Sequence, residues 1–254
     1  MPDAPPRSAP ARRELRVCGL YHDLMNIYAD RGNLIVLERR CAWRGIGFQL
    51  SRSGLGDALS ADDHDLFYIG GGQDRDQRLC AEDLLETKRD GLHAAAARGA
   101  VVLGVCGGYQ LLGHSYTLGE EEIAGVGLLD VRTLREPGPR LIGNVAIEAS
   151  LGGGEAGVLA GFENHGGRTS LGEGQQPLGR VLKGHGNDGR SGMEGARSVN
   201  TIGTYLHGPL LPKNVWFADW LIARALGLDP QELAPLADEI ERETHLSARR
   251  AAGV

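Results

Sequence analysis

The chain has 254 residues, a length that suits one large domain and is short for two. Its 27 Lys and Arg residues against 33 Asp and Glu residues give a net charge of −6, which excludes a generally basic nucleic-acid-binding surface. The 41% hydrophobic content is enough for a core and excludes a disordered protein. No uncharged apolar run approaches the ~18 residues that a transmembrane helix needs.

The first 13 residues are rich in Pro, Ala and Arg and lack the apolar segment of a secretory signal, so we expect a disordered tail at 1–13. The four cysteines, Cys18, Cys41, Cys80 and Cys106, lie far apart and form no C-x-x-C pair. This spacing argues against a zinc cluster or a disulfide framework, and it favours free thiols in a reducing cytoplasm.

The first half of the chain alternates between short apolar runs and helical patterns. Buried strands are expected at 15–20, from 48, at 65–69 and at 101–105, with helices at 28–44, at 75–98 and at 107–115. This alternation predicts an open, mostly parallel α/β sheet flanked by helices. Because ligands bind such sheets outside the carboxyl ends of the strands, we expect the site residues where these strands end.

From residue 126 onward, short apolar runs are separated by glycine-rich turns. Strands are expected at 126–131, 142–147, 158–162 and 199–206, as antiparallel hairpins added to the sheet. A helix at 215–226 would close the domain, and a charged surface helix is expected after Pro230. We therefore expect one domain over 14–228 and a charged C-terminal segment at 229–254.

Gly104-Val105-Cys106-Gly107-Gly108 follows directly on a predicted buried strand and has the pattern G-x-C-x-G. This is the thiol counterpart of the nucleophile elbow G-x-S-x-G, whose sharp turn presents the nucleophile above a sheet. The turn brings backbones so close that side chains at positions 104 and 108 would clash. At the start of the next helix, the helix dipole would favour the thiolate. The alternative is a small buried cysteine beside glycines that only allow close packing.

A thiolate nucleophile needs a base and hydrogen-bond donors for the oxyanion. Gly71 and Gly72 follow the neighbouring strand, and their amides, with that of Gly107, are candidates for the oxyanion hole. An ordinary flexible turn is the alternative for the glycine run. Among the eight histidines, His207 and His165 are the candidate bases, and His207 is preferred because it follows a strand and can reach the rim.

Nucleotide binding is not expected in this chain. The glycine run at 70–72 lacks the G-x-x-x-x-G-K-[ST] pattern with its lysine, and no dinucleotide-binding fingerprint is present. We expect neither a cofactor nor a metal ion in this chain.

These motifs resemble those of the class I, or triad, glutamine amidotransferases, whose fold is flavodoxin-like. The resemblance is carried by residues 70–72 (GGG), 104–110 (GVCGGYQ) and 204–209 (TYLHGP). Within that class, residues 161–169 (GFENHGGRT) resemble the CobB/CobQ-like branch shared with cobyric acid synthase. The compact length, with 30–33 (DRGN) and 140–144 (RLIGN), further resembles the glutaminase subunits of lipid II isoglutaminyl synthases. The resemblance covers about residues 15–226.

The resemblance implies a mechanism that agrees with the interpretation from the residues. Cys106 would attack the side-chain amide of L-glutamine. His207 would protonate the leaving ammonia and then activate water to release glutamate from the thioester. Arg140 matches the family's glutamine-binding arginine and would pair with the α-carboxylate, with Arg168 as second candidate and a plain surface arginine as the alternative. Gln110 would line the pocket from the elbow helix.

One position departs from the pattern of the class. Most members carry a carboxylate two residues after the catalytic histidine, whereas Pro209 stands there in this sequence. The third group would then come from Glu163 or from a partner subunit. We favour the partner, because an incomplete triad would keep glutaminase activity low until the partner docks.

The resemblance also implies a heterodimer with a Mur-ligase-like subunit of the MurT type. That partner would use ATP and the delivered ammonia to amidate the D-glutamate of lipid II to D-isoglutamine, a step of peptidoglycan synthesis that bears on cell shape. Any proximity to the membrane would come from the substrate or the partner. The alternatives are an amidotransferase subunit for a corrinoid-like acid, a catalytically silent scaffold that binds a partner, and a cysteine hydrolase or peptidase.

Overall fold

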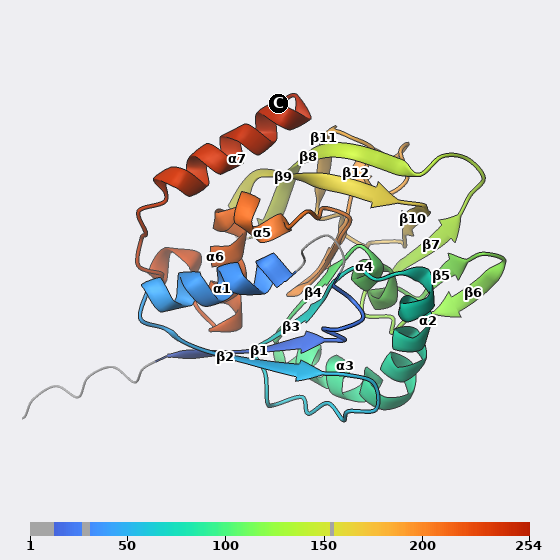
Figure 1. Cartoon of the computed structure of the whole chain (residues 1–254), viewed down its shortest axis with the longest axis horizontal. Coiled ribbons are helices and arrows are strands. Elements are labelled where there is room, and N and C mark those ends of the chain that lie inside the picture. The colour runs from blue at the N-terminus through green and yellow to red at the C-terminus, as the bar shows by residue number, and fades with distance from the viewer. Residues whose placement is uncertain (1–12, 27–30, 153–154) are drawn as a thin grey trace, which may run out of the picture.

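The computed structural model describes residues 13–26, 31–152 and 155–254, and its centre is a six-stranded sheet with the order β13-β14-β4-β3-β1-β2 (Figure 1). The strands are β1 (Glu14–Leu20), β2 (Gly47–Ser53), β3 (Leu66–Ile69), β4 (Val101–Val105), β13 (Ala196–Ser198) and β14 (Thr201–Thr204). All of them run parallel except β13, which pairs antiparallel with β14 at one edge. The predicted open, mostly parallel sheet is confirmed.

Helices cover both faces of this sheet. On one face lie α1 (Arg31–Trp43), α5 (Leu210–Lys213) and α6 (Val215–Ala225). On the other lie α2 (Asp74–Asp83), the π-helical turn η2 (Leu84–Lys88), α3 (Arg89–Arg98) and α4 (Gly107–Leu112). Side chains alternate between the two cores, so that Val17 and Leu103 face α1 and α6 while Phe67 and Val102 face the other helices. Burial on both faces explains why these strands read as continuous apolar runs.

The chain from β5 onward forms two further four-stranded sheets. One has the order β10-β7-β5-β6, with β5 (Ser115–Leu118), β6 (Glu121–Ala124), β7 (Val131–Arg135) and β10 (Gly167–Leu171). The other has the order β12-β11-β8-β9, with β8 (Leu141–Gly152), β9 (Glu155–His165), β11 (Gly179–Lys183) and β12 (Met193–Glu194). Antiparallel hairpins are thus confirmed, but most of them form separate sheets. Only β13 and β14 join the central sheet, where β14 pairs parallel with β4.

Several predicted boundaries are wrong because local apolar runs are buried without forming strands. Residues 126–130 are loop rather than strand, since the amides of Val126 and Leu129 donate to carbonyls at the end of α4. The expected strand at 199–206 is limited to β14, because Val199 turns the chain with φ 52°. The helix expected at 107–115 ends at Leu112, where the chain turns into β5. The expected start of the first helix, at 28–30, lies outside the described residues, as do residues 1–12 of the predicted tail.

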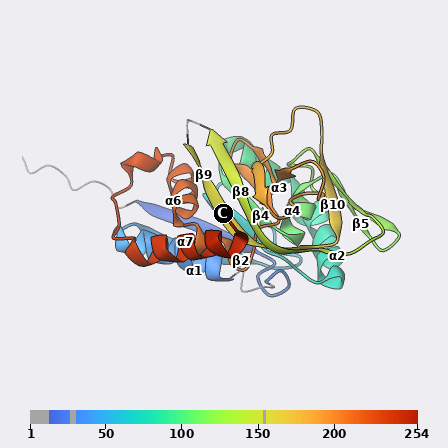
Figure 2. The same cartoon turned by 90° about the horizontal axis from the view of Figure 1, so that it is seen from above.

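The C-terminal segment forms η3 (Pro230–Glu232) and then α7 (Glu239–Ala252), which packs against β8, β9 and α5. In the view from above, α1, α6 and α7 lie toward one end of the molecule, and α2, β5 and β10 lie toward the other (Figure 2). The expected charged helix after Pro230 is present. Among the described helices, none has the length and apolarity to cross a membrane.

A buried arginine ties this C-terminal segment to the domain. Arg40 of α1 is 1% exposed and donates to both oxygens of Asp219 at 2.6 Å and to both oxygens of Asp238 at 2.9 and 2.8 Å. Arg44 also pairs with Asp219. Because two carboxylates share one buried guanidinium, removing that guanidinium leaves the two carboxylate charges unpaired at positions that solvent only partly reaches.

Arg40→Met is therefore expected to lower the free energy of unfolding by about 3 kcal/mol, since it keeps the apolar volume but removes the shared cation. Urea denaturation of the full chain measures the loss. Arg39→Met, on the exposed side of the same helix, is the matched control and should change stability little. Equal effects of the two variants would contradict this role for Arg40.

Candidate active site

Cys106 occupies a strained turn between β4 and α4. Its backbone angles are φ 55° and ψ −108°, a conformation that non-glycine residues rarely adopt and that is typical of functional turns. The Cys106 amide donates to Thr204 O, at the end of β14, at 2.8 Å. The Gly108 amide donates to Gly70 O, just beyond β3, at 3.0 Å. The turn is thus held by the ends of both strands that flank β4.

The two outer glycines of the motif are required by close backbone contact. A Cβ at Gly104 would lie 2.7 Å from Gly108 O, and a Cβ at Gly108 would overlap Ile69 O. The predicted clash is confirmed. The sequence left two explanations for these glycines, close packing or a nucleophile elbow. In the structure both apply, because the helix can start so near the strands only if both positions lack side chains.

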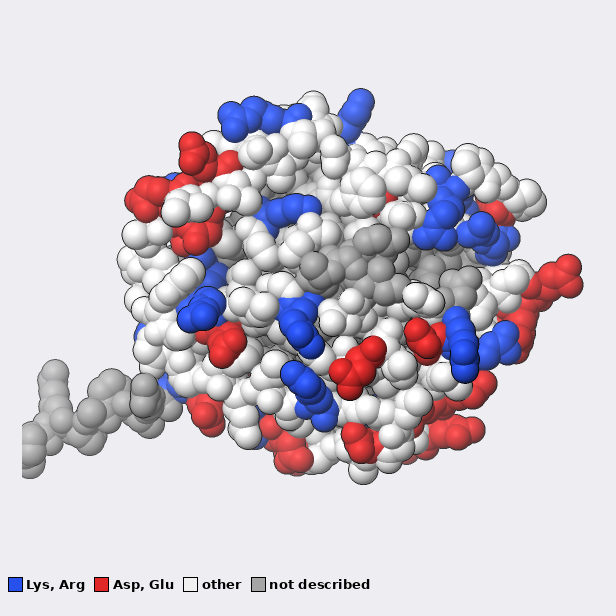
Figure 3. Space-filling model, in the orientation of Figure 1, with Lys and Arg blue, Asp and Glu red and all other residues white. Residues whose placement is uncertain are grey.

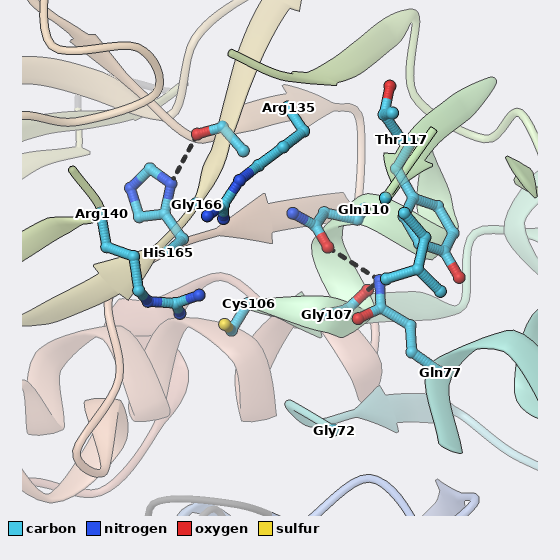
Figure 4. Close-up of a pocket in the computed structure, with 14 residues that line it drawn as sticks. Gly72, Gln77, Cys106, Gly107, Gln110, Thr117, Arg135, Arg140, His165 and Gly166 are labelled. Carbon is cyan, nitrogen blue, oxygen red and sulfur yellow. Dashed lines mark hydrogen bonds between the residues drawn. The ribbon is translucent and has the colours of Figure 1, made fainter. Parts of the chain in front are cut away.

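The Cys106 side chain lines a pocket of about 320 Å³ at the carboxyl ends of the strands. Figure 4 shows the sulfur between Arg140 on one side and Gln110 and Gln77 on the other, with Arg135 above. The wall is therefore strongly polar, with cationic and amide groups close to the thiol.

The other three cysteines are buried away from this pocket. Cys18 lies in β1, Cys41 in α1 and Cys80 in α2. Burial raises the pKa of Cys18 to about 11 and the pKa values of Cys41 and Cys80 to about 12. These thiols stay protonated at neutral pH and are poor nucleophiles, whereas Cys106 is partly exposed in the pocket.

Two of the three predicted oxyanion glycines, Gly72 and Gly107, line the pocket beside Cys106, whereas Gly71 is buried and is not part of the described wall. A Cβ at Gly72 would overlap the Met25 sulfur, and a Cβ at Gly107 would lie 2.9 Å from Oε1 of Gln77. Because neither position has a side chain or room for one, backbone atoms form this part of the wall.

His207 lies just beyond β14, and its backbone pairs with that of Phe162 through hydrogen bonds of 2.9 and 3.1 Å. Its side chain is 1% exposed. Burial, together with the charges of Lys213 and Arg140, lowers its pKa to about 4. The ring is therefore neutral at neutral pH, as a general base requires. His207 is not among the described residues of the pocket wall, so its role as base stays a prediction.

His165 does line the pocket, but its contacts fix it as part of the wall. Its Nδ1 donates to Gly167 O at 2.9 Å, and its ring stacks on Tyr205 with the centroids 3.6 Å apart. With the proton on Nδ1, the basic atom is Nε2, which lies 4.0 Å from a carboxylate oxygen of Glu163. Burial lowers the pKa of His165 to about 3. The basic nitrogen thus faces Glu163, which favours His207 as the base.

Glu163 is the internal candidate for the third group, and its carboxylate is engaged elsewhere. One oxygen accepts the His185 amide at 2.6 Å and the other accepts the Gly186 amide at 2.9 Å. Burial raises the pKa of Glu163. These contacts fix the loop at 185–186 beside His165, and they give no support to Glu163 as the partner of His207.

The two candidate arginines, Arg140 and Arg168, have different hydrogen-bond partners. Arg140 lines the pocket and is oriented by Asn164, to which Nε and Nη2 each donate at 2.8 Å. Arg168 instead donates to backbone carbonyls, to those of residues 166–167 at 3.1 and 3.3 Å and to Pro139 O at 2.9 Å. Arg168 therefore secures the segment that precedes Arg140, while Arg140 is free to contact a ligand.

Gln110 lines the pocket as predicted, and it is held by a neighbour that the sequence did not reveal. Nε2 of Gln77, on α2, donates to Oε1 of Gln110 at 2.7 Å, and Gln110 donates to the Tyr205 hydroxyl at 3.2 Å. Arg135 is a second wall residue that was missed. Gln77 sits within an ordinary amphipathic helix and Arg135 in a strand placed wrongly, so neither carried a local signal.

A buried carboxylate also escaped prediction. Glu194 is 0% exposed and accepts hydrogen bonds from the Tyr205 amide at 2.7 Å and from the Thr204 hydroxyl at 3.0 and 3.1 Å. Burial, with a smaller contribution from the charge of Glu163, raises its pKa to about 8. Since Thr204 O accepts the Cys106 amide, Glu194 secures the segment that joins the elbow to the residues before His207.

The CobB/CobQ-like glutamine amidotransferase domain matches residues 16–215 of the chain. The lipid II isoglutaminyl synthase (glutamine-hydrolyzing) subunit GatD of Staphylococcus aureus (strain N315) is 37% identical over 93% of this chain and 94% of its own length. The GatD subunit of Streptococcus pneumoniae (strain ATCC BAA-255 / R6) is 36% identical over 84% of this chain and 81% of its own. The cobyric acid synthase of Xanthobacter autotrophicus is 40% identical over 50% of this chain but only 26% of its own length.

Among solved structures, that of PurLQS from Thermotoga maritima matches with a TM-score of 0.57. The match covers 92% of this chain and 98% of that chain at 21% sequence identity. At this identity the likeness concerns the fold alone, and it supports the α/β architecture.

The raised pKa of Glu194 predicts that Glu194→Gln removes part of the pH dependence of stability. An unfolded Glu titrates near 4.5, whereas the folded protein keeps this proton up to about 8. Between those values the folded state binds more protons, so the free energy of unfolding falls as pH rises. Urea denaturation from about pH 5 to about pH 8 should show a shallower decline in the variant.

Glu148→Gln serves as the control, because Glu148 is exposed and forms an exposed ion pair with Arg180. This control should keep the wild-type decline. If Glu194→Gln kept it too, Glu194 would be ionised in the folded protein and the prediction would be wrong.

Proposed function

The chain belongs to the CobB/CobQ-like glutamine amidotransferase family, and on that premise we propose that it is the glutamine-hydrolysing subunit of a lipid II isoglutaminyl synthase. The observation that carries the proposal is the strained Cys106 elbow opening into a polar pocket that Arg140 lines. In this role the chain converts L-glutamine to glutamate and ammonia, and the ammonia amidates the D-glutamate of lipid II.

The extent of the similarities favours this role over its alternatives. The chain covers almost the whole of the GatD subunit of Staphylococcus aureus but about a quarter of a cobyric acid synthase, so a subunit for a corrinoid-like acid is not favoured. A silent scaffold would have no need of a strained thiol in a pocket, because backbone strain costs about 1–3 kcal/mol that folding must supply. A general cysteine peptidase leaves the placement of Arg140 without a purpose.

The chemistry we propose uses the chain's own residues in two half-reactions. His207, neutral at neutral pH, takes the Cys106 proton, and the thiolate attacks the side-chain carboxamide carbon of glutamine. Backbone amides at Gly72 and Gly107, with Gly71 next to them, stabilise the oxyanion. The protonated His207 then gives its proton to the leaving ammonia. A water that His207 deprotonates opens the thioester, which releases glutamate and restores the thiol.

Substrate orientation falls to Arg140 and Gln110. Asn164 holds the Arg140 side chain at the pocket wall, and a guanidinium there pairs with the α-carboxylate of glutamine. Gln110, held by Gln77, supplies a neutral amide beside the substrate's polar atoms. A preoriented arginine loses less entropy on binding than a mobile one.

The partner we propose is a MurT-type ligase subunit in a cytoplasmic heterodimer. It binds ATP and reaches lipid II, so this chain needs neither a nucleotide nor a metal ion. We also assign to the partner the acid that completes the triad with His207, because Pro209 stands at the usual position and Glu163 is bound to backbone amides. Docking of the partner would then both complete the catalytic site and place the ammonia close to its acceptor.

Cys106→Ala and His207→Ala are each expected to lower glutamine hydrolysis by the complex at least about 10³-fold, since nucleophile and base act as one unit. Glutamate release measures the rate, and thermal melting checks that the variants fold. His114→Ala, at an exposed histidine, is the control and should keep wild-type activity. Near-wild-type hydrolysis by Cys106→Ala would exclude the proposed chemistry.

The partner-supplied acid predicts that the isolated chain hydrolyses glutamine at least about tenfold more slowly than the complex, because His207 is then poorly oriented. Titrating the ligase subunit into a fixed amount of this chain, while following glutamate release, measures the activation. Full activity of the isolated chain would show that no partner residue is needed.

A further inference from the structure

A second guanidinium lines the pocket, and nothing in the proposed mechanism uses it. Arg135 ends strand β7, along which Val131 and Thr133 are buried while Arg132 and Leu134 are exposed, and Arg135 itself keeps exposed surface. Because side chains alternate along a strand, Arg135 shares the inner side with Thr133. Figure 4 shows Arg135 directed into the pocket from the side opposite Gln77, with the Arg140 guanidinium nearer Cys106.

The lack of a side chain at Gly166 leaves space for the Arg135 guanidinium. A Cβ at Gly166 would overlap Nη1 of Arg135, so the guanidinium lies directly over the Gly166 backbone. Arg168 holds this wall by donating to Gly166 O at 3.1 Å. The Arg135 guanidinium thus packs against the Gly166 backbone at the pocket wall.

Arg140 keeps one of its two pairs of donors for a carboxylate. Asn164 already takes Nε and one Nη2 hydrogen of Arg140, so the side-on pair of donors is engaged. A carboxylate has two oxygens and binds most strongly when each receives a charged donor. The end-on pair of Arg140 fills two of the roughly four lone-pair sites of a carboxylate, so a second guanidinium in the same pocket can donate to the others.

The charge of the pocket points to the same ligand group. The described residues that line it include Arg135 and Arg140 but no Asp or Glu. Figure 3 also shows Lys and Arg side chains gathered at the upper right of the face, where β7 and β10 lie in Figure 1. Such a pocket favours an anionic ligand, and of the two charged groups on the α-carbon of glutamine only the carboxylate matches it.

We propose that Arg135 is a second substrate-binding residue, which holds the α-carboxylate of glutamine together with Arg140. The pair makes the site specific for carboxamides that carry a carboxylate at the other end. Recognition then rests on the carboxylate more than on the α-ammonium group. This inference rests on the proposed glutamine hydrolysis. It adds that the pocket recognises the α-carboxylate of the substrate.

The test compares two substrates in the complex of the full chain with its ligase subunit. They are L-glutamine and its α-amide, in which a neutral carboxamide replaces the α-carboxylate. Arg135→Gln is expected to raise KM for glutamine roughly 10- to 100-fold with little change in kcat, because it removes binding that ground state and transition state share. For the α-amide the same variant should change kcat/KM less than about threefold, since the charged partner is already missing.

Arg132→Gln is the matched control, because it removes an exposed arginine from the other side of the same strand. It should leave both substrates unaffected. Arg135→Lys keeps a positive charge and should restore part of the affinity for glutamine, which a purely structural role would not predict.

Two results would overturn the assignment. One is an equal loss on glutamine and on the α-amide, which would make Arg135 a wall residue that shapes the pocket. The other is a KM for glutamine equal to that of Arg132→Gln. Failure of the proposed function would look different, because the wild-type complex itself would then release no glutamate.

Discussion

The site depends on the close contact between the start of α4 and the ends of β3 and β4. Gly104 and Gly108 have no side chains, so the helix begins against the strand backbones, and Cys106 must take a positive φ to make the turn. The same contact sets the thiol at the pocket and brings Gly107 into the wall. Strain at one residue is sustained because buried hydrogen bonds and packing on both sides fix the turn.

A layer of buried polar groups supports the pocket from the β14 side. The Tyr205 hydroxyl meets Thr169 at 2.7 Å, and Thr169 meets Thr133 at 2.7 Å, which links β10 and β7 to the segment after β14. Glu194 holds the backbone of the same segment. Since buried polar groups are costly unless paired, this network allows few other arrangements, and it joins the central sheet to both smaller ones.

The sequence predicted features whose cause is local. The parallel strands are continuous apolar runs, and the elbow is a five-residue pattern, so both could be identified without the fold. The resemblance then supplied Arg140 and Gln110. Gln77, Arg135 and Glu194 could not be found in this way, because their roles arise from neighbours distant in the chain. The strand expected at 126–131 is wrong over 126–130 for a related reason, since Val126 and Leu129 are buried in the core beside α4 without strand pairing.

The contrast among the four thiols has a consequence for oxidative damage. Cys18, Cys41 and Cys80 are sealed in the two cores and protonated, so dissolved peroxide or an alkylating reagent has little access to them. Only Cys106 meets solvent. An oxidant would therefore reach one cysteine thiol per molecule and silence the proposed activity while the two cores stayed intact, so loss of activity would be no sign of unfolding.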